Sequence, residues 1–188
     1  MKGRQLVWVI VVAVVVVGLI MAGQVLGWKN RLVALDENTK KAWAQVESQL
    51  QRRLDLVPNL VETVKGYAKH EEGVLTEVTK ARARVAGATS TDDKIAANNQ
   101  LSSALSRLLV VVESYPDLKA NQNFLSLQDE LAGTENRISV ARQRYNEAAQ
   151  LYNATRRTFP YTFVAGSFKE AAYFAAVAEA KEAPKVKF

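Results

Sequence analysis

The most continuous run of hydrophobic positions covers residues 6–26, which hold no charge and a single strongly polar residue, Gln24. As a helix this run would be about 31 Å long, which matches the roughly 30 Å of a bilayer's hydrocarbon core. Trp8 and Trp28 lie near its two ends, where indole rings favour the membrane interface. The pattern predicts a transmembrane anchor over residues 6–28, preceded by a short tail of residues 1–5.

A cleaved signal peptide is the alternative, with a tolerable cleavage site at Val25-Leu26-Gly27. The apolar part of a secretory signal is about 7–15 residues long, so this longer run favours an uncleaved, single-pass anchor. Basic residues are more numerous after the run than before it: Lys29, Arg31, Lys40 and Lys41 against Lys2 and Arg4. This asymmetry favours the cytoplasmic side for the body of the protein.

Two pairs of small residues in the anchor are one helical turn apart, Gly18 with Ala22 and Gly23 with Gly27. Such pairs let two membrane helices approach closely, and they are candidate contacts between copies. Glycine is also simply common in membrane spans, and for either pair taken alone we favour that simpler explanation.

After residue 28 the apolar positions recur at intervals of three and four, which predicts helices throughout. The first stripe contains Leu35, Thr39, Ala42, Val46, Leu50, Leu54, Val57, Val61, Val64, Ala68, Leu75, Val78 and Val85, with Glu71 as a polar exception. We expect one long helix, about 80 Å if it runs over residues 32–85, with a kink or brief break at Pro58. Asn59 is a candidate to bond the carbonyl groups that Pro58 frees.

A second helix is predicted after the loop at 87–93, where a helix-start signal follows Gly87. It stops at residues 114–117, where Pro116 cannot continue it and Asp117 can cap the next helix. The third helix has the most regular seam: Phe124, Leu127, Leu131, Thr134, Ile138, Ala141, Tyr145, Ala148, Tyr152, Thr155 and Phe159. This heptad pattern predicts a left-handed seam against a neighbouring helix.

Asn146 and Asn153 lie beside this seam, seven residues apart, and suit a role in fixing helix register within the bundle. An alanine-rich fourth helix is predicted to run to about Lys181, with Ala171, Phe174, Val177 and Ala178 available for packing. The predicted fold class is all-α: a single transmembrane helix and an elongated antiparallel bundle over residues 29–182. The bundle has three long helices plus a shorter C-terminal helix, and residues 183–188 form a tail.

The composition narrows the chemistry. There is no Cys, so disulfides, thiolate nucleophiles and Cys-ligated metals are excluded, and the single His70 excludes sites that need two imidazoles. The sequence His70-Glu71-Glu72 is more simply a solvated face than a metal site. No glycine-rich phosphate loop occurs. We therefore predict no catalytic residue, no metal, no cofactor and no small-molecule substrate.

Charge argues against nucleic acid as a partner. The formal net charge is +6, but residues 1–31 hold four basic residues and no acid, which leaves 21 basic against 19 acidic residues in the body. A nearly neutral body lacks the basic surface that nucleic-acid binding requires.

Two regions are candidate interaction surfaces. The first surrounds Pro58 and contains Arg52, Arg53, Asp55, Asn59, Lys65 and Tyr67. A contact surface on a bent helix and simple local pairing of Asp55 with an arginine are both open interpretations. The second is the aromatic stretch that follows the third helix, with Phe159, Tyr161, Phe163 and Phe168. These rings could plug the bundle, touch the bilayer or form a protein interface; plugging is the default, and the interface is the hypothesis to test.

The assembled segments resemble the LemA family. They are AWAQVESQLQRRLDLVPNLVETVKGYAKHE (42–71), VTKARA (78–83), VESYPDLKANQNFLSLQDELAGTENRISVARQRYNEAAQLYN (112–153), FPYTFVAG (159–166) and the closing APKVKF. The resemblance covers roughly residues 28–188. Residues 167–180 depart from it by being unusually rich in alanine.

The resemblance implies a bacterial protein of the cytoplasmic membrane, with an N-terminal anchor, a long antiparallel helical domain and no established enzymatic activity. Family members are similar to membrane-associated scaffolds. One branch is associated with magnetosome formation, and some members are encoded near membrane zinc proteases.

These observations favour a non-enzymatic, membrane-anchored helical scaffold or adaptor that forms homo-oligomers in the bacterial envelope. The alternative is an accessory subunit that binds and regulates a membrane enzyme such as a membrane protease. An enzyme in its own right would have to work without Cys and with His70 alone.

Overall fold

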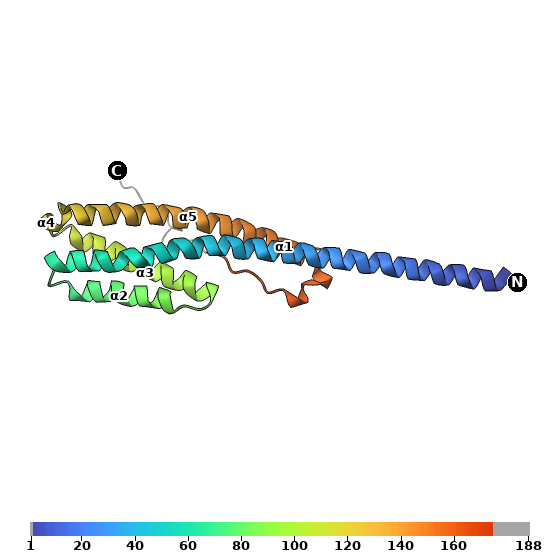
Figure 1. The fold of residues 1–188 in the computed structure, drawn as a ribbon. Coiled ribbons are helices and arrows are strands. Elements are labelled where there is room, and N and C mark those ends of the chain that lie inside the picture. The colour runs from blue at the N-terminus through green and yellow to red at the C-terminus, as the bar shows by residue number, and fades with distance from the viewer. Residues whose placement is uncertain (1, 175–188) are drawn as a thin grey trace, which may run out of the picture. The chain divides into compact units, whose positions relative to one another are not determined.

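The computed structural model describes residues 2–174, and every regular element in that part of the chain is helical (Figure 1). The all-α helical bundle is confirmed. The elements are α1 (Lys2–Tyr67), α2 (Glu72–Gly87), α3 (Thr91–Val112), α4 (Pro116–Lys119) and α5 (Gln122–Arg157), followed by the 3-10 turns η1 (Tyr161–Phe163) and η2 (Ala165–Ser167). The described residues form two compact units. Unit 1 holds residues 2–41 and 147–171, and unit 2 holds 42–146 and 172–174.

Unit 2 contains the main hydrophobic core. Its buried side chains come from the second half of α1 and from α2, α3, α4 and the start of α5, at the spacings of three and four that the sequence shows: Leu54, Val57, Leu60, Val64, Ala68, Leu75, Val78, Ala81, Val85, Ala97, Leu101, Ala104, Leu105, Leu108, Val112, Leu118 and Phe124. Each helix thus contributes one apolar face and leaves its charged face in water. Burial of these faces is the main source of stability for the unit.

Of the kink or brief break predicted at Pro58, the break does not occur. Helix α1 passes through Pro58 without interruption, and the chain reverses at residues 68–71, so the predicted helix over 32–85 is two helices. The reversal falls at Glu71, the polar exception in the apolar stripe. Its carboxylate accepts a hydrogen bond from the Tyr115 hydroxyl at 2.9 Å, and the same contact raises the pKa of Tyr115.

The continuity of α1 has a specific cause. Proline lacks the N–H that would bond the carbonyl four residues earlier, so Pro58 leaves the Leu54 oxygen without its helical donor. Arg82 on α2 supplies the missing donor: its Nε–H donates to the Leu54 oxygen at 2.9 Å. Asn59 does not fill this role, and its own backbone oxygen accepts from the Thr63 hydroxyl at 2.8 Å.

The ends of α3 and α5 depend on short polar side chains. Ser90 caps α3 by accepting from the Asp93 N–H at 3.0 Å, which fits the predicted start signal. Asp117 does not cap the third long helix, because it lies inside the short α4. Asn121 takes that role, and its Oδ1 accepts from the Phe124 N–H at 3.1 Å.

The seam of α5 is confirmed over most of its length. Phe124, Thr134, Ile138, Ala141, Tyr145, Ala148 and Tyr152 are buried, whereas Phe159, the last predicted seam position, is exposed beyond the end of the helix. The predicted C-terminal helix is wrong over residues 169–174, which are not helical, and its remaining residues lie outside those described.

Asparagine side chains hold that last segment. In unit 1, Asn153 donates to the Ala171 oxygen at 2.8 Å and accepts from the Ala171 N–H at 3.0 Å. In unit 2, Asn146 donates to the Phe174 oxygen at 3.1 Å and accepts from the Phe174 N–H at 3.0 Å. Each asparagine therefore satisfies both backbone groups of one residue, which replaces the hydrogen bonds that a helix would have provided.

The bond from Arg82 to Leu54 can be tested by a double-mutant cycle with Pro58. We expect Arg82→Ala to lower the free energy of unfolding by about 1–3 kcal/mol, because the part-buried Leu54 carbonyl loses the donor that replaces the missing Pro58 N–H. In a Pro58→Ala background the alanine N–H can bond Leu54 directly, so the same change should cost less by about 1 kcal/mol. Urea unfolding of the full-length protein in detergent, followed by circular dichroism, measures both.

Arg84→Ala is the matched control, because Arg84 is exposed and, within residues 2–174, its side chain bonds the Gln100 side chain on α3 instead of a backbone oxygen of α1. It should show no coupling to Pro58. Equal losses for Arg82→Ala with and without Pro58 would contradict the role assigned to Arg82.

Candidate functional site: the anchor and two surfaces of the helical body

The first part of α1 is long and apolar enough to cross a membrane. Its large hydrophobic side chains between Leu6 and Leu26 are exposed, which is the arrangement expected of residues that face lipid. Trp8 is exposed and Trp28 is partly buried. Together these features fit a membrane protein.

The glycines of the anchor have open surroundings. A Cβ atom added at Gly18, Gly23 or Gly27 would meet nothing within 4 Å. No close approach inside the chain therefore requires glycine at these positions. At 100° per residue, the pair Gly18–Ala22 and the pair Gly23–Gly27 lie about 140° apart around the helix, so they mark two separate faces.

Arg53, predicted as part of an exposed surface, is instead in the core. Only 6% of its surface is exposed, and its Nη1 contacts Asn98 Oδ1 at 3.1 Å, Ser102 Oγ at 2.9 Å and Glu135 Oε2 at 2.9 Å. Burial lowers the pKa of the guanidinium, and the negative charge of Glu135 opposes that change. Arg53 thus links α1 to α3 and α5 from inside the bundle, and it is not available to a partner.

The other residues near Pro58 do not form one cluster. Arg52 is exposed and lies 3.9 Å from Glu130 on α5. Asp55 accepts from Gln51 at 2.8 Å, whereas local pairing with an arginine was one of the two open interpretations. Tyr67 accepts at its hydroxyl from Asn121 at 2.8 Å. Lys65 lines an open groove of about 830 Å³ between α1 and α2.

The aromatic residues near the C-terminus separate into two groups. Phe174 is buried in unit 2, where it stacks on Trp43 at 5.8 Å, meets Tyr145 edge-on at 5.8 Å and lies 4.5 Å below the Arg142 guanidinium carbon. In unit 1, Phe159 and Phe163 are 79% and 76% exposed, and Tyr161 and Phe168 are half-buried. Plugging of the bundle therefore describes Phe174 and does not describe Phe159 or Phe163.

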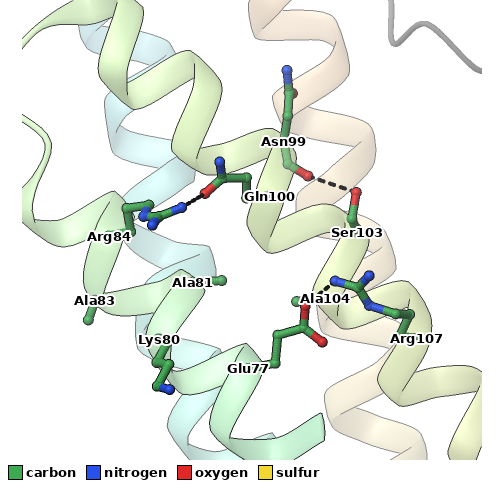
Figure 2. Close-up of a pocket in the computed structure, with 10 residues that line it drawn as sticks. All are labelled: Glu77, Lys80, Ala81, Ala83, Arg84, Asn99, Gln100, Ser103, Ala104 and Arg107. Atoms are coloured by element: carbon green, nitrogen blue, oxygen red, sulfur yellow. Dashed lines mark hydrogen bonds and ion pairs between the residues drawn. The ribbon is translucent and has the colours of Figure 1, made fainter.

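A groove of about 590 Å³ lies between α2 and α3 (Figure 2). Its floor has small side chains, including Ala81 and Ala104, and two arginines on its rim are bonded across it, Arg107 to Glu77 and Arg84 to Gln100. Polar groups that are bonded to each other in this way suit helix packing better than recognition of a polar substrate.

Metal chemistry has no support in residues 2–174, where no group of three or more His, Asp and Glu side chains could hold an ion. His70 is exposed in the turn between α1 and α2, as expected of a solvated residue. Glu71 beside it bonds Tyr115, so the sequence His70-Glu71-Glu72 is not a shared site.

Asn98 and Arg82 both act inside the helical body, although neither was predicted from the sequence. Asn98 is fully buried and lies three residues before Leu101 on the apolar stripe of α3. A polar residue at a stripe position is a usable signal for a buried hydrogen bond. Arg82 gave no comparable signal, because its partner is a backbone oxygen on another helix.

The neighbouring arginines of α1 provide a matched test. We expect Arg53→Ala to lower the free energy of unfolding by about 2–4 kcal/mol, because Asn98, Ser102 and Glu135 lose their shared partner. Arg52→Ala should change it by no more than about 0.5 kcal/mol, because its pair is exposed and long. Similar losses for the two variants in urea unfolding would contradict the buried role of Arg53.

Comparison with known proteins agrees with the architecture. A profile described as the LemA family matches residues 42–188. The magnetosome protein MamQ 2 of Paramagnetospirillum magneticum is 27% identical over 173 residues, covering 77% of this chain and 64% of that protein. Protein LemA of Metamycoplasma hominis is 25% identical over 134 residues, covering 71% of this chain and 61% of that protein.

The magnetosome protein MamQ of Magnetospirillum gryphiswaldense is 24% identical and covers 77% of this chain. The chain spans somewhat less than two thirds of the length of the curated relatives that it matches. Because the family profile covers most of the helical body described above, this chain belongs to the LemA family.

Proposed function

We propose that this protein is a non-enzymatic scaffold or adaptor that is anchored in the bacterial cytoplasmic membrane and assembles with copies of itself. The observation that carries the proposal is the continuity of α1. The residues suited to crossing the membrane and the residues that pack in the bundle belong to one helix without a break between Lys2 and Tyr67. An enzyme that is only tethered to a membrane does not need one unbroken helix from its anchor into its body. A structural protein that assembles on a membrane benefits from such a helix.

The use of charged residues supports a structural role. The buried Arg53 serves helix packing, and Arg107 on the rim of the groove between α2 and α3 is bonded to Glu77. The names of the relatives, two magnetosome proteins and a LemA protein, describe no reaction. We place the body on the cytoplasmic side because more basic residues follow the span than precede it.

Self-assembly is tested by the absolute mass of the full-length protein in detergent. A scaffold should show a defined oligomer, a multiple of the 20.8 kDa chain. Gly23→Ile and Gly18→Ile probe the two small-residue faces of the anchor separately. The open space at both positions means that neither change clashes within the chain, so a fall in mass reports a contact between chains.

Val17→Ile is the control, because it adds bulk on a third face of the same helix. It should leave the mass unchanged. A monomer for the unmodified protein would refute self-assembly. A reproducible foreign protein that co-purifies with that monomer would instead support an accessory subunit of a membrane enzyme.

A further inference from the structure

Two phenylalanine rings stand out on the surface of unit 1. Phe159 and Phe163 are 79% and 76% exposed, and their rings meet edge-on at 5.8 Å. Half-buried neighbours, Tyr161 and Val164, lie on the same turn. Two adjacent exposed rings form an apolar patch of a kind that a water-facing surface usually avoids. We therefore expect another molecule to cover this patch.

The turn that carries these rings is well built. The N–H groups of Thr162, Phe163 and Val164 donate to the oxygens of Thr158, Pro160 and Tyr161 at 3.1, 3.2 and 3.0 Å. Further on, the Arg156 side chain donates to the Phe168 oxygen at 2.9 Å, and the Tyr152 hydroxyl donates to the Lys169 oxygen at 2.7 Å. The exposure of the rings is therefore a property of a hydrogen-bonded turn.

The position of this turn along α1 follows from contacts inside unit 1. Helix α5 runs antiparallel to α1 there (Figure 1). The C-terminal end of α5 lies beside the stretch of α1 that follows the apolar run, within the same compact unit (Figure 1). Burial raises the pKa of the Tyr152 hydroxyl and the nearby charge of Asp36 raises it further, which agrees with Tyr152 lying beside that stretch. Phe159, seven residues later on the antiparallel path, is then level with about residue 29. Leu32, close to that level of α1, is fully buried.

Residue 29 lies three positions after the apolar run that ends at Leu26, which is roughly 5 Å along a helix. The headgroup layer of a bilayer is about 5–8 Å deep on each side. Lys29 and Arg31, both exposed, bring positive charge to the same level, where anionic headgroups attract it. Apolar rings beside basic side chains at this depth have the composition of an interfacial contact.

We propose that Phe159 and Phe163 insert into the interface of the bilayer leaflet from which α1 emerges, so that unit 1 holds the membrane at a second point. The occupant of the patch is lipid. The inference rests on the anchoring part of the proposed function and is independent of self-assembly.

The absence of Cys makes the test direct, because one introduced thiol is the only labelling site. A nitroxide spin label is placed in the full-length protein by Phe163→Cys or Phe159→Cys, and the protein is reconstituted in phosphatidylcholine and phosphatidylglycerol vesicles. Collisions of the label with oxygen, which concentrates in lipid, are compared with collisions with a water-soluble nickel chelate. If the rings insert into lipid, the label should collide more often with oxygen than with the nickel chelate at both positions.

Leu151→Cys is the matched control, since Leu151 is 51% exposed on α5 of the same unit and lies about 12 Å further from the span than Phe159. Its label should collide more with nickel. Lipid contact at position 151 as well would mean that α5 lies against the membrane along its length. That result would overturn the proposal that the turn with Phe159 and Phe163 makes the contact.

Val14→Cys separates this inference from the anchor itself. Oxygen in excess at position 14 with nickel in excess at 159 and 163 would overturn the second contact and leave the anchor intact. Low collision with both reagents at 159 and 163 would mean that protein covers the rings, which also overturns lipid as the occupant. A water-exposed label at position 14 would refute the anchoring on which the inference rests.

Discussion

The continuity of α1 depends on a hydrogen bond that a second helix provides. A helix can contain proline only if the carbonyl that loses its donor is satisfied in another way. Arg82 satisfies the Leu54 oxygen from α2, so the same bond preserves α1 and holds α2 against it. Without that donor, the energetic advantage would shift to a kink or break at Pro58, and the helix that contains the apolar run would end earlier.

Polar contacts of this kind also specify how the helices of unit 2 pair. An apolar seam tolerates slippage, because one leucine packs much like another, whereas a buried guanidinium needs its acceptors at fixed places. Arg53 meets Asn98 and Ser102 on α3 and Glu135 on α5 at the same time. A shifted register would leave several of these groups buried and unpaired, so the network favours a single alignment.

The parts of the structure that follow from local pattern could be predicted. The apolar run over 6–26, the stop before Pro116 and the buried face of α5 at Ile138, Tyr145 and Tyr152 all depend on neighbours in the sequence. The reversal at 68–71 was missed because Ala68 and Leu75 both face the core, so the apolar stripe continues across the turn. Arg53 and Arg82 were missed as structural residues because their long side chains reach partners distant in the sequence.

The sequence allowed the rings of Phe159 and Phe163 either to pack inside the bundle or to lie exposed as a contact surface, and it did not decide between the two. Composition shows that many aromatic residues gather there, but which of them packs inside depends on the path of the backbone. That path departs from a helix after Phe168, although the alanine-rich sequence favours helix. Tertiary hydrogen bonds from asparagine outweigh the local preference.

Those asparagine bonds have a consequence for how the protein can diverge. Asn153 and Asn146 bond only the N–H and C=O of Ala171 and Phe174, groups that nearly every amino acid possesses. Proline, which has no N–H, is the exception. Evolution can therefore rewrite side chains of the segment that point to solvent without loosening its attachment. The unusual alanine content of this part of the chain is compatible with such freedom. The segment is held by hydrogen bonds to its backbone, so its solvent-facing side chains can change while those bonds are kept.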